Sequence, residues 1–549
     1  MANKKNKNQP SYRFTFNKND VIGLPAAESE IDFERLFVET SNYEALIDVY
    51  TPKCILIGRT GTGKSALIRR IEDTQSKVKR ISPEEMSIRF LSNSTILDYL
   101  RGIGVNLNFF YKILWKHVFI VELINLYVGD SQQKRMSFLE KLKETVTGEQ
   151  KAKKQKAIAY LQDFSNDFWE ATQIRVKDIE NILEVNLSKE LSVQPYVFKG
   201  SVAEISKQIN KEQTEVKYKA EQVINQLQAE KLIEIIKIFK EDVFSDYQKR
   251  YFIIVDDLDK DWVSQQIVYD LIAAMVEVVQ EFHTHFKGVK IILALRDNIH
   301  MLAISGSEHR GGQREKFAAL DLHLRWNKEE LLTFLNIRLR HLSNGKIVTD
   351  YLFDKEFKNE GINYILERTY MRPRALISFI NKIIEQADKK SHFSKNIIKL
   401  AEPYYSTERL HAIDDEWSEN YGKISRICNF LNGTNNNRPV ESITESHFES
   451  VYFSEGFCQN FKGRLLDICL DVKDEKIPFI EFKMEVLFIL YHVGIIGVKL
   501  SSQKALCFYY DQIEIVRKED FLPTAKISVH KALYSYFKVN TREQEVVDY

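Results

Sequence analysis

An eight-residue glycine loop constrains the fold of this chain more than any other feature. Residues 58–65 read Gly-Arg-Thr-Gly-Thr-Gly-Lys-Ser, the phosphate-loop pattern G-x-x-x-x-G-K-S. The apolar run Cys54–Ile57 precedes this loop, and the helix-forming stretch Ala66–Arg70 follows it. Strand, glycine loop and helix therefore occur in the order that a parallel α/β phosphate-binding core requires.

The loop residues carry the chemistry of nucleoside triphosphate binding. Glycines let successive backbone N–H groups turn inward around a phosphate, and the start of the following helix adds a positive dipole end. Lys64 is expected to reach the β- and γ-phosphates, and Ser65 to offer its hydroxyl to Mg²⁺. The predicted nucleotide-binding residues of this loop are Gly58, Arg59, Thr60, Gly61, Thr62, Gly63, Lys64, Ser65 and Ala66.

One sequence pattern bears on whether ATP or GTP is bound. Residues 17–20 match the guanine-reading N-K-x-D, but they precede the phosphate loop and no D-x-x-G follows it. This order argues against GTP, so the sequence predicts ATP and Mg²⁺ as the ligands.

A second nucleotide-site signature follows a long interval. The apolar run Tyr251–Val255 ends in Asp256 and Asp257. A buried strand would deliver Asp256 beside the phosphate loop to hold Mg²⁺, while Asp257 could polarise an attacking water. The alternative is a buried strand that ends in a polar turn. Asp259 could cap a helix that begins near Trp262.

Two further strands are expected beyond this signature. Val289–Leu295 is a buried-strand pattern that ends at Arg296, where a guanidinium could sense the γ-phosphate or could form a local ion pair. Leu320–Leu324 is a fifth strand candidate after the short candidate Lys77–Ile81, and it leads through Trp326 into an amphipathic helix. Lys64, Asp257 and Arg296 are therefore the predicted catalytic residues.

The chain of 549 residues is long enough for two to four domains. The region from about residue 95 to 249 is nearly free of Gly and Pro and favours helices. An apolar stripe runs from Val216 to Leu227 and continues through Leu232, Ile235 and Phe239, and it is either a packing face or a partner-binding helix. The fold class predicted is an α/β P-loop core with a large helical insertion, a helical lid and a C-terminal winged-helix-like region. The expected divisions are 1–50 as an N-terminal segment, 51–105 and 250–326 as the core, 106–249 as the insertion, 327–400 as the lid and 401–549 as the C-terminal region.

Composition bears on the partners and the cellular compartment that are expected for this protein. The 78 Lys and Arg residues nearly balance the 77 Asp and Glu residues, so no global field draws the protein onto nucleic acid or membrane. The five cysteines are odd in number and never form C-x-x-C, which argues against a disulfide framework or a zinc site and favours the cytoplasm. The apolar stretch 117–128 contains Glu122 and Asn125 and is too short to span a bilayer, so no membrane association is expected.

These motifs together resemble the STAND and KAP P-loop ATPases, relatives of the AAA+ enzymes within the additional-strand class. The resemblance covers about Ile31–Asn381 and is carried by residues 58–65, 255–262, 295–297, 324–326 and Arg372-Pro-Arg374. It implies a nucleotide-driven conformational switch of the kind common in bacterial antiphage systems, with Arg374 as a lid arginine that contacts the nucleotide. KAP proteins often carry membrane helices between the two motifs, whereas no membrane helix is expected in this insertion. AAA+ enzymes usually have Glu where Asp257 stands, which leaves the rate of hydrolysis open.

The C-terminal region is expected to contain a winged-helix-like module. Glu481–His492 is an amphipathic helix, Gly494 and Gly497 break it, Ala505–Tyr510 is a strand candidate and Ser528–Phe537 favours a final helix. Its basic residues are balanced by acidic ones, so contact with protein is favoured over DNA binding.

Three functions stay open at this level. The leading one is a cytoplasmic ATPase switch that regulates a partner protein or a homo-oligomer. The second is an ATPase that loads on or remodels DNA, and the third is a nucleotide-dependent scaffold with negligible turnover. Arg310 or Arg314 could complete a neighbour's site as an arginine finger, or could belong to a surface loop.

Overall fold

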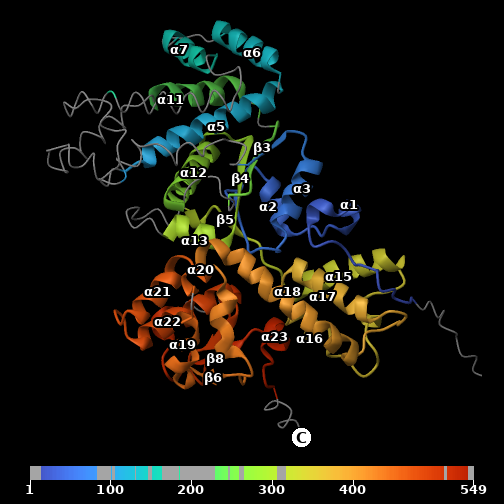
Figure 1. Ribbon diagram of the computed structural model, residues 1–549. Coiled ribbons are helices and arrows are strands. Elements are labelled where there is room, and N and C mark those ends of the chain that lie inside the picture. Colours follow the sequence, from blue (N-terminus) through green and yellow to red (C-terminus); the bar gives the residue numbers. More distant parts are fainter. Residues whose placement is uncertain are drawn as a thin grey trace, which may run out of the picture. The chain divides into compact units, whose positions relative to one another are not determined.

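The chain divides into two compact units in the computed structural model (Figure 1). Residues 39–59 and 64–324 form one, here called the sheet unit, and residues 1–38, 60–63 and 325–549 form the other, here called the helical unit. The tip of the phosphate loop, residues 60–63, is thus grouped with the helical unit. The structure describes residues 14–82, 101, 106–129, 131–145, 151–162, 185, 229–244, 246, 248–258, 265–305, 317–454, 456–511 and 516–541.

The sheet unit is built on five parallel strands. Their order across the sheet is β2 (Val78–Ile81), β3 (Tyr251–Val255), β4 (Val289–Leu295), β1 (Ile55–Ile57) and β5 (Asp321–His323). Strands β1, β3 and β4 are buried along their whole length, as continuous apolar runs in a parallel sheet require. The strands expected from the sequence are confirmed, and β4 lies between β1 and β3.

The described helices of the sheet unit belong partly to the core and partly to the insertion. They are α2 (Ser41–Ile47), α3 (Lys64–Thr74), α5 (Asn108–Val128), α6 (Gln132–Thr145), α7 (Lys151–Gln162), α11 (Ala229–Ile238) with a π-helical end at Phe239–Val243, α12 (Gln265–His285) and α13 (Asp297–Ser305). Trp115 is buried in α5, and its indole Nε1 donates to the carbonyl of Leu271 on α12 at 2.8 Å. The first part of the predicted stripe, 216–227, lies outside the described residues, whereas Ile235 and Phe239 of its continuation are buried in the core. Among the helices that are described, none is both long and apolar enough to cross a membrane.

A buried lysine ties α2 to the sheet. Lys290 is 1 % exposed in the middle of the sheet unit, and its Nζ donates to the carbonyls of Ala45, Asp48 and Thr51 at 2.8, 2.5 and 3.3 Å. Burial disfavours the charged ammonium and lowers the pKa of Lys290 to about 8. Lys290 therefore holds the segment before β1 through that segment's backbone carbonyls and not through an acidic side chain.

The helical unit begins with short helices, η1 (Ala27–Ser29) and α1 (Phe33–Leu36), and continues after the sheet. Its main helices are α15 (Lys328–Ser343), α16 (Gly361–Leu366), α17 (Pro373–Gln386) and α18 (Lys395–Tyr421), with the 3₁₀ turn η5 at Thr349–Tyr351. Asn327 and Glu330 form a capping box at the start of α15. Helix α17 has an apolar face, because Leu376, Phe379, Ile380, Ile383 and Ile384 are all buried.

Residues 424–541, here called the C-terminal module, contain helices and a small antiparallel sheet. The helices are η6 (Ile424–Leu431), η7 (Val440–Ser442), η8 (Glu445–His447), α19 (Glu449–Tyr452), α20 (Phe457–Asn460), α21 (Gly463–Lys473), α22 (Phe479–Val493), η9 (Tyr509–Asp511), η10 (Lys518–Asp520), η11 (Lys531–Leu533) and α23 (Tyr534–Phe537). The strands β6 (Arg438–Pro439), β8 (Lys526–Val529) and β7 (Ile496–Lys499) pair in that order.

Two sequence predictions for this module are wrong. Ala505–Tyr510 forms no strand: Cys507 makes an isolated bridge to Val498, and the segment then turns into η9, where the Asp511 carboxylate accepts from the Phe508 N–H at 3.0 Å. The expected helix Ser528–Phe537 begins as strand, because β8 pairs with β7 over Lys526–Val529 before α23 forms.

A third correction concerns a glycine. Gly494 ends α22 with φ +87° as expected, whereas Gly497 lies inside β7. A Cβ at Gly497 would come within 2.8 Å of the Phe508 ring, so this position needs glycine for close packing.

Candidate nucleotide site

The candidate residues of the sheet unit meet at one edge of the sheet. Gly58, Asp256 and Arg296 each follow directly after β1, β3 and β4. The register pairs Ile57 with Leu295 in parallel strands, so their carboxyl ends lie at the same edge. Ligands of open parallel sheets bind at this edge.

Lys64 is held by its own loop. Its Nζ donates to the carbonyl of Gly58 and lies 3.4 Å from the carbonyl oxygen of Arg59. Lys64 is the first residue of α3, with Ser65 and Ala66 directly after it in the first turn, and all three are half-buried. The ammonium group therefore lies across the loop where a phosphate would be bound.

Asp256 is a buried carboxylate with a cationic partner. It is 8 % exposed, and Arg80 Nη2 on the edge strand β2 donates to its Oδ2 at 2.6 Å. Burial raises the pKa of Asp256, an effect that the backbone N–H of Asp257 and the charges of Arg80 and Lys64 oppose. A buried carboxylate already balanced by a cation fits a divalent metal ligand.

Asp257 has an unusual backbone conformation. Its φ is +60°, in the left-handed region that non-glycine residues seldom adopt. Residues held in this region concentrate at active sites. The turn after β3 therefore differs from an ordinary strand end at the residue predicted to act on water.

The tip of the phosphate loop is bonded within the helical unit through three successive carbonyls. The Thr60 oxygen accepts from Arg372 Nη1 at 3.1 Å, the Gly61 oxygen from the Arg374 N–H at 3.3 Å and the Thr62 oxygen from Trp326 Nε1 at 2.7 Å. In a planar trans peptide the C=O and the next N–H point in opposite directions. The N–H groups of residues 61–63 therefore all face away from these three donors, as a phosphate cradle requires.

Two further features of the tip fit a phosphate. Gly61 and Gly63 have φ of +84° and +103°, and a Cβ at Gly61 would lie 2.8 Å from the Arg374 Cβ. The Thr60 hydroxyl oxygen is buried and has no hydrogen-bond partner among the residues that the structure describes. The inward N–H groups suit an anion, and the Ser65 hydroxyl with the Asp256 carboxylate suits Mg²⁺.

The remaining predicted residues fall in different places. Arg374 contributes its backbone N–H to the loop, and its side-chain Nε donates to the Pro25 carbonyl at 3.0 Å. Arg296 is half-buried just before α13, and its carbonyl accepts from the His300 N–H at 2.9 Å. Asp259, Arg310 and Arg314 lie outside the described residues.

Sequence reasoning gave no role to four residues of the site, although Trp326 and Arg372 belong to the segments that carry the resemblance. Arg80 partners Asp256, and Trp326, Arg372 and Glu416 contact the loop tip, where Glu416 Oε1 accepts from the Thr60 N–H at 3.1 Å. The residues joined by this last bond are 356 positions apart, so no local pattern could reveal it. For Arg372, the available signal was its position at the N-cap of a helix that begins with Pro373.

Comparisons with known proteins cover different parts of the chain. The family model described as the FunZ-associated C-terminal helical domain matches residues 329–414, which include α15, α17 and most of α18. The "Putative transposon gamma-delta 80.3 kDa protein" of Escherichia coli (strain K12) is 22 % identical over 511 residues, which are 90 % of this chain. The chain spans 64 % of the length of that curated relative.

One solved structure shares a distant overall likeness. The Walker-type ATPase PABY2304 of Pyrococcus abyssi is 12 % identical, with 94 % of this chain and 97 % of that chain covered. At a TM-score of 0.35 the likeness is too weak to support an inference about function.

Proposed function

We propose that this chain is a Mg²⁺-dependent ATPase that acts as a nucleotide-driven conformational switch. The observation that carries the proposal is the shape of the phosphate loop, whose three tip carbonyls are bonded outward so that the N–H groups of residues 61–63 face the other way. Lys64 completes this cradle from α3. Such an arrangement suits the phosphates of a nucleotide and has no other evident use.

Each residue at the sheet edge has a role in this proposal. Lys64 binds the β- and γ-phosphates, Ser65 and Asp256 hold Mg²⁺, Asp257 orients the attacking water and Arg296 senses the γ-phosphate. When bound, Mg²⁺ neutralises charge on the phosphate oxygens. Arg80 must give up part of its bond to Asp256 for the metal to enter.

The switch part of the proposal rests on the helices that hold the loop. Arg372 and Arg374 belong to the start of α17, and Glu416 belongs to α18, which continues into the C-terminal module. A change at the loop tip on nucleotide binding or hydrolysis would thus act directly on these helices. The motif resemblance to STAND and KAP ATPases supports regulation of a partner or assembly in a bacterial defence system, in the cytoplasm.

Steady-state phosphate release from ATP tests the proposal. Wild type should turn over ATP, whereas Lys64→Ala should lose ATP affinity and Asp257→Ala should bind ATP but lose hydrolysis. Full ATP affinity and turnover in Lys64→Ala would refute the proposal. Tight ATP binding with no turnover by the wild type would favour a scaffold instead, which the aspartate at position 257 permits.

A DNA-loading or DNA-remodelling ATPase is the second candidate, favoured by the printed name of the transposon relative and by the winged-helix interpretation of the C-terminal module. The charged residues of the module argue instead for a packing role. Lys518 and Arg464 both pair with Glu485 at 2.9 Å, and the buried Lys483 donates to two backbone carbonyls. DNA binding that weakens with salt and stimulates hydrolysis several-fold would promote this candidate. No binding at low salt would remove it.

A further inference from the structure

A buried ion pair makes hydrogen bonds to both the N–H and the carbonyl of one loop residue. Thr60 donates its N–H to Glu416 Oε1 at 3.1 Å, and its carbonyl accepts from Arg372 Nη1 at 3.1 Å. The same Arg372 Nη1 lies 3.6 Å from Glu416 Oε2, and the two side chains are only 11 % and 7 % exposed. The pair therefore engages both peptide groups of Thr60 and closes on itself.

We propose that Arg372 and Glu416 are positioning residues for the phosphate loop and that they couple it to α18. The inference rests on the proposed function, since it concerns how ATP is bound there. Neither residue needs to touch the nucleotide. The pair instead fixes the plane of the peptides on either side of Thr60, and thereby the direction of the next N–H groups.

The first step of the argument concerns Lys64. The N–H of Thr60 and the carbonyl of Arg59 belong to one peptide group, so they point in opposite directions. Glu416 accepts from the N–H, and Lys64 Nζ lies 3.4 Å from the carbonyl oxygen. A charged acceptor on one end of this peptide therefore also orients its carbonyl, which is the more distant of the two carbonyls that Lys64 Nζ approaches.

The second step concerns the carbonyl end of Thr60. Arg372 donates there, and the following N–H, on Gly61, faces the other way. Charge-assisted hydrogen bonds are shorter and about twice as strong as neutral ones. A buried arginine that loses its carboxylate partner is left with an uncompensated charge, so neither residue can be removed without disturbing the other.

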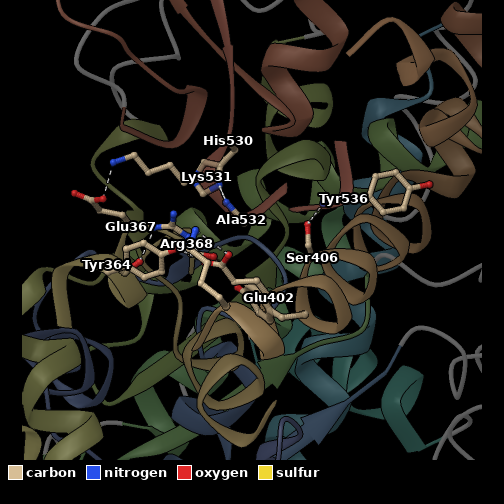
Figure 2. A network of polar contacts seen from close by, with 11 residues as sticks. Tyr364, Glu367, Arg368, Glu402, Ser406, His530, Lys531, Ala532 and Tyr536 are labelled. Atoms are coloured by element: carbon tan, nitrogen blue, oxygen red, sulfur yellow. Dashed lines mark hydrogen bonds and ion pairs between the residues drawn. The ribbon is translucent and has the colours of Figure 1, made fainter. Parts of the chain in front are cut away.

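The third step links the pair to the C-terminal module. Trp417, the neighbour of Glu416 in α18, is buried, and its ring centroid lies 5.1 Å from that of His492 on α22. Further back on α18, Ser406 Oγ accepts from the Tyr536 N–H at 3.0 Å, and Glu402 pairs with Arg368 at 2.9 Å (Figure 2). Helix α18 thus contacts the module through Trp417 and Ser406, and Glu416 is its bond to the phosphate loop.

The turn between α16 and α17, just before Arg372, adds a second connection. Tyr370 and Met371 have φ of +53° and +51°, two consecutive left-handed residues that only strong surroundings can hold. The Tyr370 ring stacks on His530 of the module, with ring centroids 3.7 Å apart. The Arg372 Cζ atom lies 5.1 Å from the Tyr370 ring centroid. His530 is itself fixed, since its Nδ1 accepts from the Ala532 N–H at 3.1 Å.

The test measures ATP binding and turnover in full-length Glu416→Gln. Glutamine keeps the shape and can still accept from Thr60, but it removes the charge and the ion pair. We expect the Kd and KM for ATP to rise about tenfold while kcat stays within about threefold, because the residues at the sheet edge are untouched. Glu419→Gln is the matched control, since Glu419 lies on the same helix in a half-exposed pair with Lys462, and it should change neither value by more than twofold.

A second measurement follows hydrogen exchange in α22 with and without ATP and Mg²⁺. We expect ATP to change exchange around His492 in the wild type and in Glu419→Gln, and to change it far less in Glu416→Gln. Arg372→Lys keeps the charge and should fall between wild type and Glu416→Gln in ATP affinity, which covers the case in which Glu416→Gln folds poorly.

The outcomes separate the two proposals. If the wild type binds ATP, Lys64→Ala does not, and both Glu416→Gln and Arg372→Lys bind like wild type, the positioning pair is refuted and the proposed function stands. If the wild type itself binds no ATP, the proposed function fails and this inference falls with it.

Discussion

Two arginine–carboxylate pairs, one in each unit of the chain, serve the candidate site in different ways. In the sheet unit, Arg80 and Asp256 are 33 % and 12 % exposed, and one arginine nitrogen holds the carboxylate. In the helical unit, Arg372 and Glu416 are 11 % and 7 % exposed and both also bond to Thr60. On the proposed function, the more open pair exchanges its cation for a metal ion, whereas the closed pair holds its backbone partner.

This difference separates chemistry from positioning. A residue that must bind a ligand needs a partner that can leave, so its carboxylate is buried but its arginine stays partly in water. A residue that shapes a loop needs partners that stay, so both side chains are buried. Variants of the two pairs should therefore differ in which kinetic constant they change.

Asp256→Asn should have the largest effect. The uncharged amide is a much weaker Mg²⁺ ligand than the carboxylate, so Mg²⁺-dependent phosphate release should fall at least ~100-fold through kcat. Glu416→Gln should act mainly on KM. Phosphate release measured over a range of ATP and Mg²⁺ concentrations distinguishes the two, and an equal loss of kcat in both variants would erase the distinction between the pairs.

Lys290 sharpens the comparison because it is a buried cation bound by carbonyls rather than by a carboxylate. Its pKa is lowered from 10.5 to about 8, so the unfolded chain binds more protons than the folded one between these values and stability rises with pH there. From pH 8 upward the free energy of unfolding should gain on the order of 2 kcal/mol. Denaturant unfolding at pH 7.5 and 9.5 should show this gain in wild type and a smaller one in Lys290→Met. Equal slopes in the two proteins would contradict the assignment.

Trp326→Phe tests a neutral donor to the same loop. Loss of the indole N–H leaves the Thr62 carbonyl without its donor, so ATP affinity should fall about fivefold to tenfold. Trp115→Phe is a matched control, since it breaks the same kind of bond, to Leu271, inside the sheet unit. That control should lose stability with no change in ATP affinity measured on the folded protein. Loss of affinity in both variants would mean that Trp326 acts only through stability.

Arg80→Met should have the smallest effect. Without Arg80, Mg²⁺ no longer competes with a cation for Asp256, so the Mg²⁺ concentration for half-maximal turnover at pH 8 should fall about threefold. A rise instead would show that Arg80 itself binds the nucleotide.

The sequence allowed the sheet and much of the site to be predicted because their patterns are local. The phosphate loop, the buried runs that end at Asp256 and Arg296 and the apolar face of α17 each occupy a short segment with one dominant periodicity. Arg80, Trp326 and Glu416 could not be found this way, because each acquires its partner only through folding across 176, 264 and 356 residues.

Two predictions for the C-terminal module are wrong for a related reason. The sequence predicts a helix that includes Ser528 and Val529, yet Ser528 pairs with Gly497 and Val529 with Ile496, partners far away in sequence. Ala505–Tyr510 has the aromatic content of a strand, but its rings pack on Gly497, His530 and Tyr370 instead of extending the sheet. Tertiary packing overrode local propensity at both places.

The most direct test of the account is residue-resolved hydrogen exchange at the tip of the phosphate loop, with and without ATP and Mg²⁺. The account predicts that ATP slows exchange at Gly61, Thr62 and Gly63, whose N–H groups face away from the helical donors, and leaves Thr60 unchanged, because Glu416 already protects it. Protection that appears at Thr60 alone, or no protection anywhere in residues 60–63, would contradict the claim that this loop is shaped from outside to bind phosphate.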